Sequence, residues 1–104
     1  MSARNPVKVE VSVTVSGGSG SATFPAMLST SVIDITFIDG PNGGTCDFSI
    51  LDLESDPVYV RTGITLDALL SQAEDKYVAG AGFTLSLSNA TDGSYLIKCW
   101  KFDQ

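Results

Sequence analysis

The chain has 104 residues, of which 43% are hydrophobic and 17% are charged, and its formal net charge is −6. This length fits one domain with a modest core, and the apolar fraction excludes a disordered tail. The acidic balance argues against nucleic acid as a partner, because phosphate binding needs clustered Lys and Arg, and the absence of histidine removes imidazole as a general base or metal ligand.

The N-terminal part predicts a short arm and then a long strand. Residues 1–6 are polar and end at Pro6, so we expect an arm that frays or reaches a neighbouring subunit. It has no apolar stretch typical of a secretory signal, and no run in the chain approaches the ~20 residues that span a bilayer. We therefore expect synthesis in a cytoplasm and no membrane partner. Valine alternates with polar residues over 7–15, which predicts a strand that begins a single domain over 7–104.

The middle of the chain predicts a loop and then a hairpin. Residues 16–21, SGGSGS, fit a loop between strands better than a domain boundary, and 22–25 is a short extended piece. Two alternating strands, 31–39 and 45–53, flank a turn with three glycines. The first strand has a predicted core face of Ile33, Ile35 and Phe37 and a predicted solvent face of Asp34 and Thr36. The second has a predicted core face of Cys46, Phe48 and Ile50.

Residues 57–76 predict a short strand and the one helix of the fold. The strand covers 57–62 and follows an acidic turn. The helix covers 65–76, because Thr65 is a suitable N-cap and apolar residues recur at helical spacing after it. These apolar residues are Leu66, Leu69, Leu70 and Ala73. A helix this short is marginal alone, so it should dock on the sheet.

Residues 83–102 predict the hairpin on which the rest of the chain packs. An alternating strand over 83–88 is followed by a turn over 89–94 and a second strand over 95–102, and we expect the two strands to pair antiparallel. The second strand is apolar on both faces. One face has Tyr95, Ile97 and Cys99, and the other has Leu96, Trp100 and Phe102. Because a bare patch of this kind would be sticky, a partner subunit, the helix or the arm should cover the second face.

Together these segments predict an all-β fold. Six or seven short strands at spacings of about 8–12 residues, with one short helix, are typical of an antiparallel β-sandwich. A small closed β-barrel is the alternative. Cys46 and Cys99 lie in strand-like runs without a C-x-x-C spacing, so we expect buried thiols, with a disulfide between facing strands as the other possibility.

Two groups of carboxylates are candidate sites: Asp52, Glu54 and Asp56, and Asp34, Asp39 and Asp47. The first group has a spacing that suits calcium, but it lacks the EF-hand pattern, which favours a solvated turn. The second group offers a glycosidase-like pair, but nothing in the sequence predicts the pocket that raises the pKa of such an acid. Asn89-Ala90-Thr91 matches a glycosylation acceptor, but without a secretory signal we attribute the match to turn chemistry. We therefore expect no enzymatic activity, no metal and no cofactor.

The strings ATFPAML, SVIDITFID, CDFSILDLESDPVYVRTG and FTLSLSNATDGSYLIKCW resemble small β-sandwich structural proteins of tailed bacteriophage particles. The resemblance covers roughly residues 22–100 and consists of strand order, the spaced phrase DF-I-D…VY-RTG and the hairpin TLSLSNATDGSY. It implies a non-enzymatic virion protein. In such a role the chain would be a capsid decoration (cement) protein that binds and stabilises the outer capsid surface. A carbohydrate- or receptor-binding module of a head fibre or tail is the alternative.

The resemblance also implies partners and a location. The protein would assemble in the virion with the major capsid protein or other virion proteins, as a homo-oligomer with a trimer favoured. Strand edges, the arm and the second apolar face are the expected contacts. The candidate interface residues are Trp100, Phe102, Leu96, Val7 and Pro6.

Overall fold

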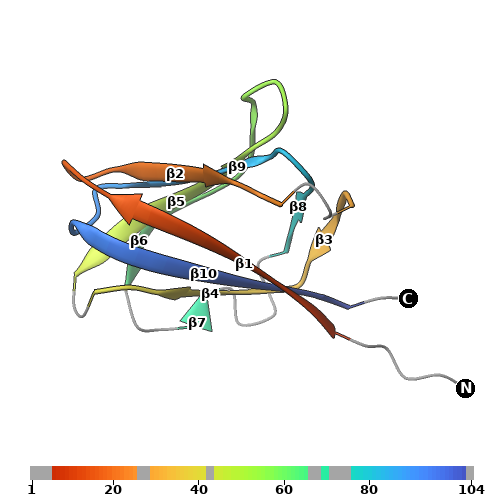
Figure 1. Cartoon of the computed structure of the whole chain (residues 1–104), viewed down its shortest axis with the longest axis horizontal. Coiled ribbons are helices and arrows are strands. Elements are labelled where there is room, and N and C mark those ends of the chain that lie inside the picture. Colours follow the sequence, from red (N-terminus) through yellow and green to blue (C-terminus); the bar gives the residue numbers. More distant parts are fainter. Residues whose placement is uncertain (1–5, 26–28, 42–43, 66–68, 71–75, 103–104) are drawn as a thin grey trace, which may run out of the picture.

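The chain folds as a β-sandwich. The computed structural model describes residues 6–25, 29–41, 44–65, 69–70 and 76–102, and all regular secondary structure in these residues is strand (Figure 1). Two four-stranded antiparallel sheets form the body, and a two-stranded sheet lies at one end. The predicted all-β sandwich is confirmed. It is not a closed barrel, because each four-stranded sheet has its own edge strands.

The described residues form ten strands, several of them very short. In chain order they are β1 (Pro6–Val15), β2 (Gly20–Thr23), β3 (Ser31–Ile33), β4 (Ile35–Asp39), β5 (Thr45–Leu51), β6 (Pro57–Thr65), β7 (Leu69–Leu70), β8 (Tyr77–Ala79), β9 (Thr84–Ser88) and β10 (Gly93–Phe102). One sheet has the order β1-β10-β4-β7 and the other β2-β9-β5-β6, while β3 pairs with β8. The number exceeds the six or seven expected because β3, β7 and β8 have only two or three residues each.

Both predicted hairpins are wrong, because each of their turns carries the chain from one sheet to the other. β9 pairs with β2 and β5, whereas β10 pairs with β1 and β4. In the same way, β4 and β5 lie in opposite sheets. Alternation and turn residues identified the strands, but the same signals serve a hairpin and a crossing between layers. A true antiparallel neighbour pair forms instead between β5 and β6.

The predicted strand over 31–39 is interrupted at Asp34, between β3 and β4. After the interruption the buried positions are Thr36 and Ile38, with 0% and 1% of their surface exposed. Ile35 and Phe37 are therefore not on the core face, contrary to the prediction, and both are half-buried. The physical reason is that one residue outside the alternation moves every later side chain of the strand to the opposite face.

The predicted helix over 65–76 is not present in the described part of that stretch. Thr65 is the last residue of β6, and Leu69–Leu70 form β7, which pairs with β4. Other predicted helical positions, Leu66 and Ala73 among them, lie outside the described residues. Helical spacing is a local signal, and here strand pairing prevails over it at the described positions.

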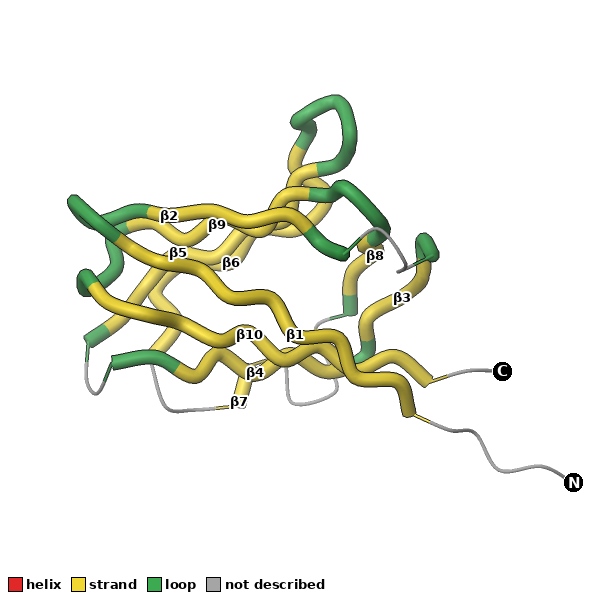
Figure 2. The backbone as a smooth tube through the Cα atoms, viewed as in Figure 1, coloured by secondary structure: helices red, strands yellow, loops and turns green. Residues whose placement is uncertain are grey.

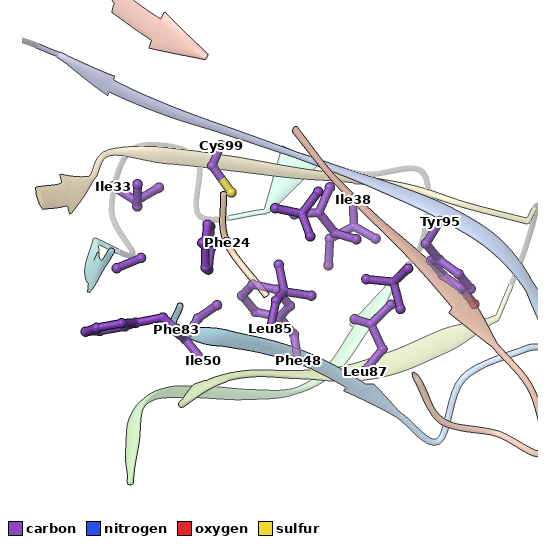
Figure 3. Packing of buried hydrophobic residues seen from close by; sticks show 14 of the residues in the cluster. Phe24, Ile33, Ile38, Phe48, Ile50, Phe83, Leu85, Leu87, Tyr95 and Cys99 are labelled. Carbon is purple, nitrogen blue, oxygen red and sulfur yellow. The ribbon is translucent and has the colours of Figure 1, made fainter. Parts of the chain in front are cut away.

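The core fills the space between the two large sheets, where side chains from both layers point toward one another (Figure 3). The fully buried set includes Ile38, Ile97 and Cys99 from one sheet and Phe48, Ile50, Leu85 and Leu87 from the other. Both cysteines are buried and free, so the predicted thiols are confirmed and the alternative disulfide is not formed. The ring of Tyr95 lies against Gly40, where an added Cβ would come within 2.5 Å of it. Only glycine fits this close approach.

β10 is the strand that organises one layer. It pairs with β1 in an unbroken register from Pro6–Phe102 to Val15–Gly93, and the two strands run side by side along the whole sandwich (Figure 2). β4 pairs with β10 only over residues 96–100. The outer end of the β1–β10 ribbon therefore extends beyond the pairing with β4.

Candidate assembly surface

The outer face of the β1-β10-β4-β7 sheet carries apolar side chains that the core does not use. Directly opposed residues of antiparallel strands place their side chains on the same face. Three cross-strand rows make up this face: Lys8–Trp100–Ile35, Glu10–Lys98–Phe37 and Ser12–Leu96–Asp39. We call Ile35, Phe37, Leu96 and Trp100 the outer patch. All four side chains are half-buried.

The two faces of β10 carry the two sets of side chains that the alternation predicts, and the structure shows which face is the core. Tyr95, Ile97 and Cys99 point into the core and have 2%, 0% and 0% of their surface exposed. Leu96 and Trp100 alternate with them and point away from the facing sheet. The inner face of β10 thus belongs to the core, and the outer patch is additional apolar surface.

Charged side chains lie in the same cross-strand rows as the apolar side chains of the outer patch. The Nζ of Lys98 lies 5.7 Å from the centroid of the Phe37 ring, and the Nζ of Lys8 lies 3.5 Å from Oε2 of Glu10. Exposed interactions of these kinds contribute roughly 0.5–1 kcal/mol or less each. They therefore orient side chains on this face more than they stabilise the fold.

The other large sheet presents a different outer face. Its cross-strand rows are Ser21–Ser86–Ser49–Val60 and Thr23–Thr84–Leu51. Hydroxyl groups dominate these rows, and the exposed apolar side chains at the β6 edge are two valines, Val58 and Val60, which are 40% and 59% accessible. Exposed aliphatic residues in such small numbers are ordinary. The clustered aromatic surface thus belongs to only one of the two large sheets among the described residues.

The structure unites only part of the predicted interface. Trp100 and Leu96 lie together in the outer patch. Val7 is 36% exposed, but it belongs to the opposite, inward-pointing set of β1. Pro6 pairs with Phe102 at the end of the β1–β10 ribbon. The structure describes the strand pairing of these two residues but not their side chains.

Sequence reasoning missed two members of the outer patch, Ile35 and Phe37, because it placed them in the core. One signal was available. Phe37 and Ile38 are adjacent apolar residues, so β4 cannot have a purely polar face. This double apolarity matches that of β10, its neighbour in the sheet.

The acidic turn after β5 uses its first carboxylate to hold its own backbone. Oδ1 of Asp52 accepts hydrogen bonds from the N–H groups of Glu54 at 2.8 Å and Asp56 at 2.9 Å. This is the local bonding that makes Asp a turn residue. Within the described residues, no group of three or more acidic or cysteine side chains is placed to hold a metal ion.

The three other candidate carboxylates belong to different surroundings. Asp34 precedes β4 and Asp39 is its last residue, whereas Asp47 lies on β5 in the opposite sheet. Asp47 accepts hydrogen bonds from the N–H of Gly63 at 2.9 Å and from Nδ2 of Asn89 at 2.7 Å. These bonds hold the pKa of Asp47 below its ordinary value, the Gly63 N–H being the larger cause. A glycosidase acid needs the opposite shift.

No protein-family model matches the chain, and no curated protein matches it in sequence. In the part of the chain that the structure describes, no helix is long and apolar enough to cross a membrane. Function is therefore inferred from the fold and the outer patch.

Proposed function

We propose that the protein is a non-enzymatic virion structural protein, a capsid decoration protein that binds the outer surface of a phage capsid. The supporting observation is the outer patch, a cluster of two aromatic and two aliphatic side chains on the outside of a sheet whose inner face packs into the core. Large apolar clusters on an outer surface are typical of protein interaction sites. The sequence resemblance to phage structural proteins supports the same role.

The mechanism is static. The patch residues extend from β10 and β4, which are hydrogen-bonded to each other in a regular register, so little conformational freedom is lost on docking. Full burial of a large apolar side chain contributes about 1.5–3 kcal/mol, and these half-buried side chains contribute part of that. Repeated over many subunits of one shell, a modest contact per subunit strengthens the whole capsid.

Binding to capsids that lack the protein tests this role. The purified chain should co-sediment with them, and Trp100→Thr should reduce binding by at least about tenfold because it removes the largest side chain of the outer patch. Val60→Thr, on the outer face of the other sheet, is the matched control and should bind like the wild type. Failure of the wild-type chain to bind, or equal binding of both variants, would overturn the proposal.

A carbohydrate- or receptor-binding module of a fibre or tail is the second candidate. One observation favours it: a shallow pocket of about 430 Å³ next to Leu96 is lined by the hydroxyls of Ser12, Thr14 and Ser94 and the carboxylate of Asp39. Hydroxyl and carboxylate groups are suitable partners for sugar hydroxyls. If glycans change the fluorescence of Trp100 while capsids do not bind, this second role replaces the first.

A further inference from the structure

The long strand β1 is an edge strand. One of its sides pairs with β10 along all ten residues, and no described strand pairs with its other side. Near its end β1 turns back, with Ser16 N–H donating to the Ser19 carbonyl at 3.1 Å. There β2 begins so close that a Cβ on Gly20 would lie 2.3 Å from the Thr14 carbonyl oxygen. Among the described residues, the open part of the edge therefore covers residues 6–12.

The direction of the backbone groups on this open edge follows from the ladder. The carbonyl of Trp100 accepts a hydrogen bond from Asp34 N–H, so Trp100 directs its backbone groups away from β1. Backbone groups alternate in direction along a strand, so Cys99 directs its own groups toward Val9, its partner on β1. It follows that Lys8, Glu10 and Ser12 direct theirs to the open edge.

This edge has some of the usual protections against pairing and lacks others. Natural edge strands are blunted by bulges, by inward-pointing charges, by being very short, or by Lys and Pro on the edge, and of these β1 has Lys8 and Pro6. β1 has ten residues, no register shift against β10 and only valines on its inward face. Pro6, which has no N–H, stands at the very end of the open segment.

The sequence of the open edge is complementary to itself. When two copies of β1 run antiparallel around a two-fold axis at Val9, Lys8 of each copy lies opposite Glu10 of the other. Val9 then faces its own counterpart, and Val7 faces Val11. Opposite charges in directly opposed positions stabilise a strand pair, and each Lys8–Glu10 pair exchanges both of its backbone hydrogen bonds.

We propose that β1 pairs with β1 of a second copy of this chain in that register, which joins two β1-β10-β4-β7 sheets into one continuous sheet. The inference goes beyond the proposed function, because it concerns the free protein and needs no capsid. An isologous contact of this kind closes at two subunits. It therefore favours a dimer in solution over the trimer that the resemblance implies, and it would place two outer patches on the same side of one sheet.

Charge exchange at residues 8 and 10 tests the register. The wild-type chain should sediment as a dimer that dissociates on dilution. Lys8→Glu alone sets like charges opposite each other at both pairs, as does Glu10→Lys alone, so each variant should self-associate at least about tenfold more weakly. An equimolar mixture of the two variants should recover a dimer that contains one chain of each, because every opposed pair is then complementary.

The mixing experiment also distinguishes the proposed contact between two chains from the Lys8–Glu10 ion pair within one chain. That ion pair is absent from both variants and is not restored by mixing, so recovered association reports only the pairing between chains. The double variant Lys8→Glu/Glu10→Lys should dimerise with itself. A wild-type monomer or trimer at all concentrations, single variants that associate like the wild type, or a mixture that stays monomeric would overturn the inference. None of these outcomes bears on capsid binding, which the Trp100→Thr comparison tests separately.

Discussion

At the scale of single residues, the hydroxyl groups of Thr36 and Tyr77 lie 2.6 Å apart in the interior, where water does not reach them. The Tyr77 hydroxyl is also 3.5 Å from Sγ of Cys99. Burial raises the pKa of Tyr77 and of Cys99 above their ordinary values, so both groups stay neutral near pH 7. This cluster connects β8 to β4 and β10. It fixes how the short end sheet meets the large one.

Removal of the Thr36 hydroxyl should destabilise the protein. Thr36→Val keeps the shape but leaves the Tyr77 hydroxyl with only its long contact to Cys99, and a buried hydroxyl without a good partner costs about 1–3 kcal/mol. Urea unfolding measures this cost. Addition of Tyr77→Phe should recover part of the loss, because the orphaned group is then gone. A double variant whose loss equals the sum of the single losses would show that the two hydroxyls do not act as a pair.

At the scale of elements, the sequence predicts strands better than it predicts their partners. The alternation of valines in β1 and of leucines in β9 is a property of each strand alone, so both strands are recognisable from the residues themselves. The partner of a strand depends on which layer the preceding turn enters, and turns of similar composition lead to either layer. For this reason both expected hairpins are crossings between sheets.

The members of the outer patch, like the strand partners, can be predicted only in part from the sequence. The double apolarity of β10 places Trp100 and Leu96 on an outer face correctly. Alternation assigns Ile35 and Phe37 to the core, because the interruption at Asp34 has no sequence signal as strong as a glycine or proline. The phase of β4 is set by the pairing with β10, in which Cys99 opposes Thr36, and such pairing between distant segments cannot be read from local alternation.

Asp47 links three elements of the second sheet through one carboxylate. It lies on β5, binds the N–H of Gly63 on β6 and binds the side chain of Asn89 after β9. Asn89 has a φ of 48° and Gly63 a φ of 67°, so the carboxylate supports two left-handed backbone positions. Both hydrogen bonds favour the ionised form.

Acid should therefore weaken the fold partly through Asp47. Because its pKa is lower in the folded than in the unfolded chain, its contribution is complete above the unfolded value of about pH 4 and is lost as the pH falls through the folded value. Thermal unfolding measured from pH 7 downward should show a smaller decrease in Tm for Asp47→Asn than for the wild type. Asn89→Ala, which removes one of the two donors, should lie between them. An identical acid decrease in all three proteins would contradict this role.

At the scale of the whole molecule, the two broad outer faces are chemically different. One face presents hydroxyl rows that suit water, and the other presents the outer patch together with Lys8 and Lys98. In the proposed assembly the first face is turned to solvent and the second to the capsid. A dimer formed through β1 would present two such patches on one side, so that the contacts of both subunits with a capsid would be simultaneous.

The temperature at which capsids release their DNA tests the central claim most directly. Capsids that lack the protein should release DNA at a higher temperature once the wild-type chain has bound to saturation, because each bound subunit must dissociate before the shell opens. Val60→Thr should give the same increase and Trp100→Thr should give little or none at equal concentration. An unchanged release temperature with fully occupied capsids would contradict the claim that this protein stabilises the shell.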